Sequence, residues 1–204
     1  MAERKLPDDV DPQSGFRLPL PDRDGLDEEA RAVYDRFNDP NSDTYVGLRG
    51  PGGIRLHSPE NSKTIQAVNR YIRYGAGIDP RDRELSILVV ARELDSQFEW
   101  TAHESEALKR GVSQETVDVI KYRKATDGVP EADALIIHLG RQIFGDHRLT
   151  SETYALALER FGAAGLVDFV SLMGNYAQTA ALLAAFDMQI HPDWEPLLPL
   201  PDEG

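Results

Sequence analysis

The sequence predicts an all-α protein, with one helical domain between two irregular arms. Helix-start signals recur along the chain, at Ser58-Pro59, Asp79-Pro80 and Ser113. Apolar residues after these signals follow helical spacing, and no segment shows the alternation typical of β-strands. A chain of 204 residues, 41% of them hydrophobic, is long enough to bury a full core. We therefore expect one domain over residues 26–190, an N-terminal arm over 1–25 and a C-terminal arm over 191–204.

The arms and the first helices follow from proline, glycine and capping residues. Prolines interrupt residues 1–25, and four more lie within 191–204, so both stretches are expected to be irregular. The first helix is expected over 27–37, where Glu28 and Glu29 suit the positive end of the helix dipole. A glycine-rich loop is expected over 38–57. Ser58 and Pro59 then favour a helix over 58–74 that ends at Gly75.

The remaining helices are bounded by similar signals. Asp79 and Pro80 open a helix that runs to a break near residues 95–96, and the next helix covers 97–110 before Gly111. Ser113 caps a short helix over 113–123. Peripheral helices are expected over 131–144 and 151–161. A long central helix is expected over 165–186, where repeated alanines allow close contact with neighbouring helices.

Charge and cysteine content exclude several classes of function. The net charge of −13 argues against nucleic acid and anionic membrane lipid as partners, because phosphate binding needs clustered Lys and Arg. A small anionic substrate stays compatible with this charge if arginines gather in a pocket. The absence of cysteine excludes disulfides, thiolate metal sites and cysteine nucleophiles. Residues 1–24 carry no signal peptide pattern, and the most apolar region, 162–188, is too polar to span a membrane, so we expect a cytoplasmic protein.

The segment from Glu84 to His103 carries the clearest chemical pattern. Glu99, His103 and Glu106 occupy positions i, i+4 and i+7 of one predicted helix and therefore project along one side. A carboxylate beside an imidazole fixes the orientation of the ring and favours its charged form. Glu84 lies on the preceding helix, and spacing alone does not bring it to His103. The pattern therefore predicts that either Glu84 or Glu99 is the carboxylate partner of His103.

Two other interpretations of these residues stay open at this stage. A Glu-x-x-x-His pair is commonly a solvated surface pair, and Glu84 is equally compatible with a buried structural acid. A metal site is the main chemical alternative, since Glu84, Glu99, His103 and Glu106 offer oxygen and imidazole ligands. The Glu-x-x-His spacing of helical di-iron sites is absent, so the sequence favours a site without metal.

The same segment resembles the core motif of the carboxymuconolactone decarboxylase family, which includes the alkylhydroperoxidase D branch. The redox branch has Glu, eleven residues, Cys-x-x-Cys, three residues and His. Here Ser96 and Glu99 stand at the two thiol positions, between Glu84 and His103. The sequence Phe98-Glu99-Trp100-x-x-His103 is similar to the decarboxylase branch. The resemblance extends over about residues 49–188, and the 84–103 core is its specific part.

This resemblance implies both a fold and an activity. The fold would be a helical bundle of the alkylhydroperoxidase D-like type, assembled as a homo-oligomer, a trimer or a hexamer. The activity would be a cofactor-independent decarboxylation, or a related proton transfer, on a small anionic lactone or keto acid. His103 would be the general acid, and Glu84 or Glu99 would orient it. Thiol peroxidase chemistry is not implied, because both cysteines are replaced.

Five further residues are candidates for substrate binding, each with a structural alternative: Arg49, Arg55, His57, Trp100 and Tyr176. The two arginines lie in the glycine-rich loop and suit a carboxylate anchor, although a salt bridge on an acidic surface is the favoured explanation for either one taken singly. His57 precedes a helix N-terminus, which favours anions, and a local cap is the alternative. Trp100 and Tyr176 are compatible with substrate contact and with core packing.

A function from another class is also compatible with the sequence. The chain would then be a non-catalytic helical oligomer, a binding or scaffold protein that lost its redox chemistry with its cysteines. That function predicts an exposed His103 or a site filled by side chains. The enzyme predicts a cavity bordered by Glu84, Glu99 and His103.

Overall fold

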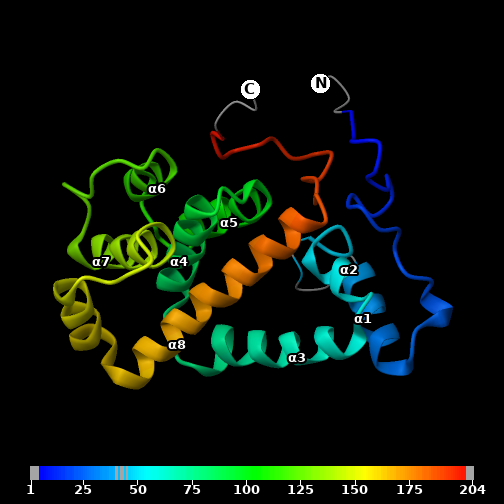
Figure 1. Cartoon of the computed structure of the whole chain (residues 1–204), viewed down its shortest axis with the longest axis horizontal. Coiled ribbons are helices and arrows are strands. Elements are labelled where there is room, and N and C mark those ends of the chain that lie inside the picture. The colour runs from blue at the N-terminus through cyan, green and yellow to red at the C-terminus, as the bar shows by residue number, and fades with distance from the viewer. Residues whose placement is uncertain (1–4, 40, 42–43, 45, 201–204) are drawn as a thin grey trace. The chain divides into compact units, whose positions relative to one another are not determined.

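A computed structural model describes residues 5–39, 41, 44 and 46–200, and these contain helices and no β-strand (Figure 1). The prediction of an all-α fold is confirmed. The α-helices are α1 (Glu28–Asn38), α2 (Pro51–Arg55), α3 (Pro59–Arg70), α4 (Pro80–Glu93), α5 (Gln97–Lys109), α6 (Gln114–Lys121), α7 (Glu131–Gly140) and α8 (Ser151–Ala185). A 3₁₀ turn covers Arg23–Gly25, and π-helices cover Tyr71–Gly75 and Arg141–Gly145.

Side-chain caps start several helices where the sequence predicts them. Asp27 accepts a hydrogen bond from the backbone amide of Ala30 at the start of α1, and Ser113 accepts one from Thr116 at the start of α6. Asp79 caps α4 in the same way, with Pro80 in its first turn. Each bond satisfies an amide that has no partner within its helix, so these starts are set by local sequence.

The structure differs from the prediction in the loop expected over 38–57. The loop expected over 38–57 contains α2, which begins at Pro51, a residue whose fixed φ suits a first helical turn. Within that loop, residues 40, 42–43 and 45 lie outside the described part of the chain. The helices expected over 151–161 and 165–186 are both present as the two parts of α8, which is kinked at the expected break. Only Gly162 departs from helical geometry there, with φ 66° and ψ 172°, a conformation open to glycine because it lacks a Cβ.

The contacts of the chain define two compact units. The first unit comprises residues 1–68 and 181–195, and the second comprises 69–180 and 196–204. In the first unit, the amide of Arg17 donates to the carbonyl of Phe186, and the amide of Gln189 donates to the carbonyl of Gly15. Phe16, which lies between Gly15 and Arg17 in the sequence, is fully buried. The expected N-terminal arm is therefore packed into the first unit. The domain boundaries near residues 25 and 190 stay predictions.

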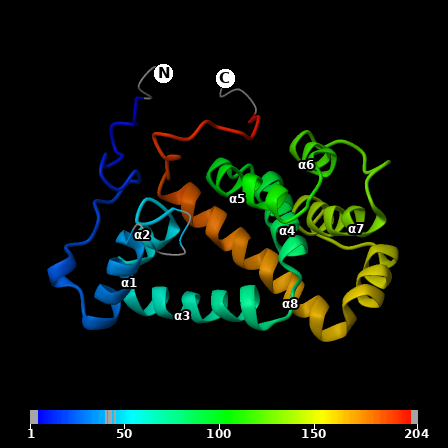
Figure 2. The ribbon, with the colours of Figure 1, turned by 180° about the vertical axis from the view of Figure 1, so that it is seen from behind.

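The second unit is built around α4, whose residues 83–92 are all buried. This helix contacts α5, α6, α7 and the π-helix Arg141–Gly145, and Figures 1 and 2 show it beside α5 and α7 from both sides. Leu198, from the expected C-terminal arm, is buried, and its amide and carbonyl both bond to the side chain of Gln97. Among the described residues, no helix combines the length and the apolar character that a bilayer span requires.

Gly140 marks a close approach between α7 and α4. A methyl group added there would overlap the side chain of Val89 and would lie 3.4 Å from Met173. We expect Gly140→Ala to lower the free energy of unfolding by roughly 1–3 kcal/mol, because overpacking forces neighbouring side chains out of place. Unfolding in urea measures this change.

Two further variants make the Gly140 prediction specific. Val89→Ala in the Gly140→Ala background should recover part of the lost stability, because it removes the overlapping methyl groups. Gly174→Ala in α8 is the matched control, since an added methyl there meets nothing within 4 Å and alanine favours a helix over glycine by roughly 0.5–1 kcal/mol. Equal effects of the two glycine substitutions would contradict the predicted overlap.

Candidate active site

Glu84 of α4 and His103 of α5 are joined by a hydrogen bond inside the second unit. The Glu84 Oε2 atom lies 2.7 Å from His103 Nδ1. Both residues are buried, Glu84 completely and His103 with 5% of its surface exposed. The helices that carry them pack against each other, and the chain turns between them at Asp95, which has a φ of 49°. The packing of α4 against α5 therefore brings Glu84 to His103, a contact that the spacing in the sequence did not predict by itself.

Glu99 lies on the other side of the same imidazole. Its Oε2 atom is 3.6 Å from His103 Nε2, and its side chain is also buried. The two ring nitrogens of His103 thus face two different carboxylates, one from each helix. Because an ionised carboxylate can only accept, the bond to Glu84 assigns a proton to Nδ1. This arrangement fixes the ring, with Nε2 on the side of Glu99.

The surroundings of Glu84 favour its ionised form. Burial opposes ionisation, but the hydrogen bond and charge of His103, the charge of Arg73 and a hydrogen bond from Arg83 together hold the pKa of Glu84 below its ordinary value. The Arg83 Nε atom donates to Glu84 Oε1 at 3.1 Å. Glu84 therefore acts as a fixed negative charge beside the imidazole.

Arg73 and Arg83 are residues of this cluster that the sequence did not indicate. The Arg83 Nη1 atom donates to the carbonyl of Arg73 at 2.8 Å. The Arg73 guanidinium donates in turn to the hydroxyl of Tyr176, which lies on α8. The Tyr176 ring meets the His103 ring edge-on, with centroids 5.5 Å apart and planes at 88°. Of the candidates for substrate contact, Tyr176 is thus the one that the structure brings to His103.

Tyr176 carries a neutral hydroxyl in this site. Burial raises its pKa above the ordinary value, against the opposing charge of Arg73. A buried phenol with an arginine donor on its oxygen retains its own proton for donation. The cluster therefore combines an imidazole, two carboxylates, two guanidinium groups and a phenol within one unit of the chain.

A known family matches the part of the chain that carries Glu84, Glu99 and His103. The model of the carboxymuconolactone decarboxylase family matches residues 59–137. That segment is similar to the carboxymuconolactone decarboxylase family. The match contains Glu84, Glu99 and His103 and is narrower than the resemblance expected over 49–188. No curated protein shows a significant match to the chain.

Trp100, although part of the family motif, belongs to a separate buried cluster. It is fully buried, and its indole nitrogen donates to Glu104. Lys121 binds the same carboxylate at 2.8 Å and lies 5.6 Å from the centroid of the Trp100 ring. Glu106, the third acidic or histidine position expected on this side of α5, pairs with Arg110 at 2.7 Å.

The other three candidates for substrate contact lie in the first unit. Arg49 donates to the carbonyls of Pro12 and Gln13, at 2.9 and 3.2 Å. The exposed His57 ring meets Phe16 edge-on, and the half-buried Arg55 ends α2. Because the decarboxylase motif lies in the second unit, a substrate role for Arg49, Arg55 and His57 stays a prediction.

No metal centre is indicated within the described ranges. No group of three or more His, Cys, Asp or Glu side chains there is arranged to hold a metal ion. Glu84 is hydrogen-bonded to Arg83 and His103. It is one of the ligands that the sequence offers for a metal site.

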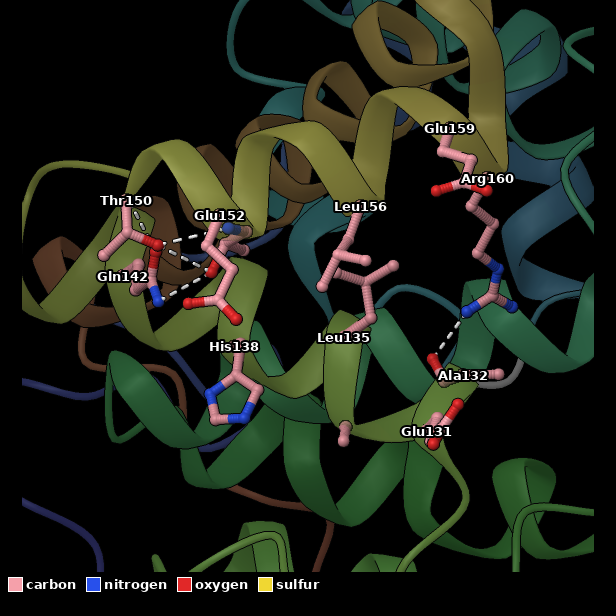
Figure 3. Close-up of a pocket in the computed structure, with 12 residues that line it drawn as sticks. Glu131, Ala132, Leu135, His138, Gln142, Thr150, Glu152, Leu156, Glu159 and Arg160 are labelled. Carbon is pink, nitrogen blue, oxygen red and sulfur yellow. Dashed lines mark hydrogen bonds between the residues drawn. The ribbon is translucent and has the colours of Figure 1, made fainter.

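A pocket of about 930 Å³ lies elsewhere in the second unit, between α7 and the first half of α8 (Figure 3). Leu135 and Leu156 face each other across it, and three glutamates and Arg160 line it. Arg160 already has a hydrogen-bond partner within the protein, since it donates to the carbonyl of Ala132 at 2.5 Å. None of the cluster around His103 lines this pocket, so it is not the cavity that the enzyme was expected to form beside His103.

Proposed function

We propose that this protein is a cofactor-independent acid–base enzyme of the carboxymuconolactone decarboxylase family. Its substrate would be a small anionic lactone or keto acid. The observation that carries the proposal is the buried hydrogen bond of 2.7 Å between Glu84 and His103. A histidine held by a carboxylate in a buried site is suited to proton transfer at neutral pH. The homo-oligomer expected from the family resemblance stays a prediction.

The proposed reaction breaks the bond between the substrate carbon and its carboxylate. The electron pair of that bond moves into the adjacent carbonyl group, carbon dioxide leaves, and an enolate remains. His103 then donates the proton on Nε2 to the carbon that lost the carboxylate. One carboxylate is thus exchanged for one hydrogen, and no electron acceptor is needed. A proton from solvent restores His103.

The two glutamates have different parts in this proposal. Glu84 holds Nδ1, keeps the ring in one orientation and stabilises the protonated imidazole. Glu99 lies 3.6 Å from Nε2, on the side from which the proton is given. It is suited to guide a proton from solvent back to that nitrogen after each turnover. Both roles use charges that the fold already holds in place.

The proposal is tested by measuring carbon dioxide release from 4-carboxymuconolactone and a small panel of β-keto and lactone acids. The protein is treated with a chelator, and the reaction is run in D₂O. Release with one deuterium on the product carbon would support the acid–base decarboxylase. No release from any substrate would contradict it and would favour the non-catalytic binding protein instead.

A further inference from the structure

Among the described residues, Arg73 makes no direct ion pair, although its charge acts on Glu84. Its side chain is half-buried, in the middle of the π-helix Tyr71–Gly75. Among residues 5–39, 41, 44 and 46–200, no carboxylate oxygen lies within 4.0 Å of its guanidinium, and its side-chain contacts are with tyrosines. Arg83, by contrast, is bonded to Glu84. A partly desolvated cation without an ion pair favours the binding of an anion.

The hydroxyl of Tyr176 points to the same ligand. It accepts a hydrogen bond from Arg73, so its own proton is directed away from that residue. No acceptor for this proton is found in the part of the chain that the structure describes. The Tyr176 residue is 6% exposed, and a buried O–H group without an acceptor costs free energy until a ligand accepts its hydrogen bond.

Both donors lie next to the histidine of the proposed reaction. The Tyr176 ring contacts His103 edge-on, with 5.5 Å between centroids. Tyr74, which is 69% exposed, lies 5.8 Å from the guanidinium carbons of both Arg73 and Arg83. An anion bound to Arg73 would therefore sit between His103 and an aromatic side chain at the surface.

We propose that Arg73 and Tyr176 form a binding site for an anionic oxygen of a small organic acid. In the reaction proposed above, on which this role rests, that oxygen is the one on which the enolate charge collects. A guanidinium and a phenol that are already in place stabilise such a charge without reorganising solvent. The ligand class is a planar monoanion, for which benzoate is a simple probe.

Calorimetric titration of the full-length protein with benzoate and with neutral benzamide tests this site. We expect the wild type to bind benzoate and to bind benzamide far more weakly. Arg73→Gln should weaken benzoate binding by about tenfold to a hundredfold, because it removes a charge-assisted hydrogen bond. Tyr176→Phe, which keeps the ring on His103, should weaken it by about threefold to tenfold.

Two variants serve as controls for charge and for folding. Arg73→Lys keeps the charge without the planar fork and should bind benzoate between the wild type and Arg73→Gln. Arg148→Gln removes an exposed arginine of the same unit and should bind as the wild type does. Circular dichroism during heating confirms that each variant is folded.

Failure of this site and failure of the proposed reaction give different results. A folded Arg73→Gln variant that binds benzoate as tightly as the wild type would overturn the anion site, whatever the activity. Equal binding of benzoate and benzamide, or no benzoate binding at millimolar concentration, would overturn it as well. His103→Gln should retain benzoate binding even if the decarboxylase proposal is wrong, because the anion is held by Arg73 and Tyr176.

Discussion

Replacing His103 by glutamine is expected to lower the rate of carbon dioxide release by roughly 10²–10⁴-fold, the usual contribution of a positioned general acid. Glutamine fills similar space and can still donate a hydrogen bond to Glu84. It cannot carry and deliver a proton, so the carbanion would wait for a proton from solvent. The measurement is single-turnover release from the best substrate of the panel, with His103→Ala as a second variant.

A surface histidine provides the matched control for the His103 prediction. His147 is exposed and has a φ of 58°, a backbone conformation that asparagine tolerates well. His147→Asn should therefore keep the full rate. A folded His103→Gln protein that also keeps the full rate would remove the acid–base mechanism, because His103 is the histidine that the structure places beside Glu84.

Replacing Glu84 by glutamine is expected to lower the free energy of unfolding at neutral pH by roughly 3 kcal/mol, as for other broken buried ion pairs. The buried Arg83 guanidinium loses its carboxylate, and glutamine has one acceptor oxygen where Glu84 uses two, so either Arg83 or His103 Nδ1 loses its hydrogen bond. Glu106→Gln on the same pair of helices should cost only about 0.5 kcal/mol, because its partner Arg110 is largely exposed.

The loss of stability caused by Glu84→Gln should become smaller as the pH falls. The pKa of Glu84 is lower in the folded protein than its ordinary value of 4.5, so the unfolded chain binds this proton more readily. The stabilisation is therefore complete above about pH 4.5 and is lost as the pH falls through the folded value. Urea unfolding at a series of pH values should show the wild type and Glu84→Gln converging in acid. A difference that stays constant would contradict a carboxylate held ionised by its neighbours.

The helix starts could be predicted from the sequence because they depend on neighbouring residues. Asp79 and Ser113 bond to amides two and three residues away, so the relevant interactions lie inside a short window. The break in α8 was predictable as well, since the sequence places it between residues 161 and 165 and the kink lies at Gly162. Glycine adopts the positive φ of this kink without strain, so the residue type itself marks the position.

The candidate site was predictable to the extent that its residues share one helix. Glu99 and His103 are four residues apart, and helical geometry alone puts them on one side of α5. The bond between Glu84 and His103 depends on how α4 packs against α5, and only the family resemblance indicated it. Arg73 and Tyr176 are separated by 103 residues, and no local pattern reports a contact over that distance.

The π-helix Tyr71–Gly75 makes the site sensitive to the length of the chain. A π turn closes over five residues where an α turn closes over four, so it accommodates one residue more. Deleting a single residue there would restore the α-helical repeat and rotate the preceding side chains by about 100° relative to those that follow. Arg73 would then lose its alignment with Tyr176 although both residues were still present. Among relatives, the presence of this extra residue would accordingly identify the members that keep the arginine in place.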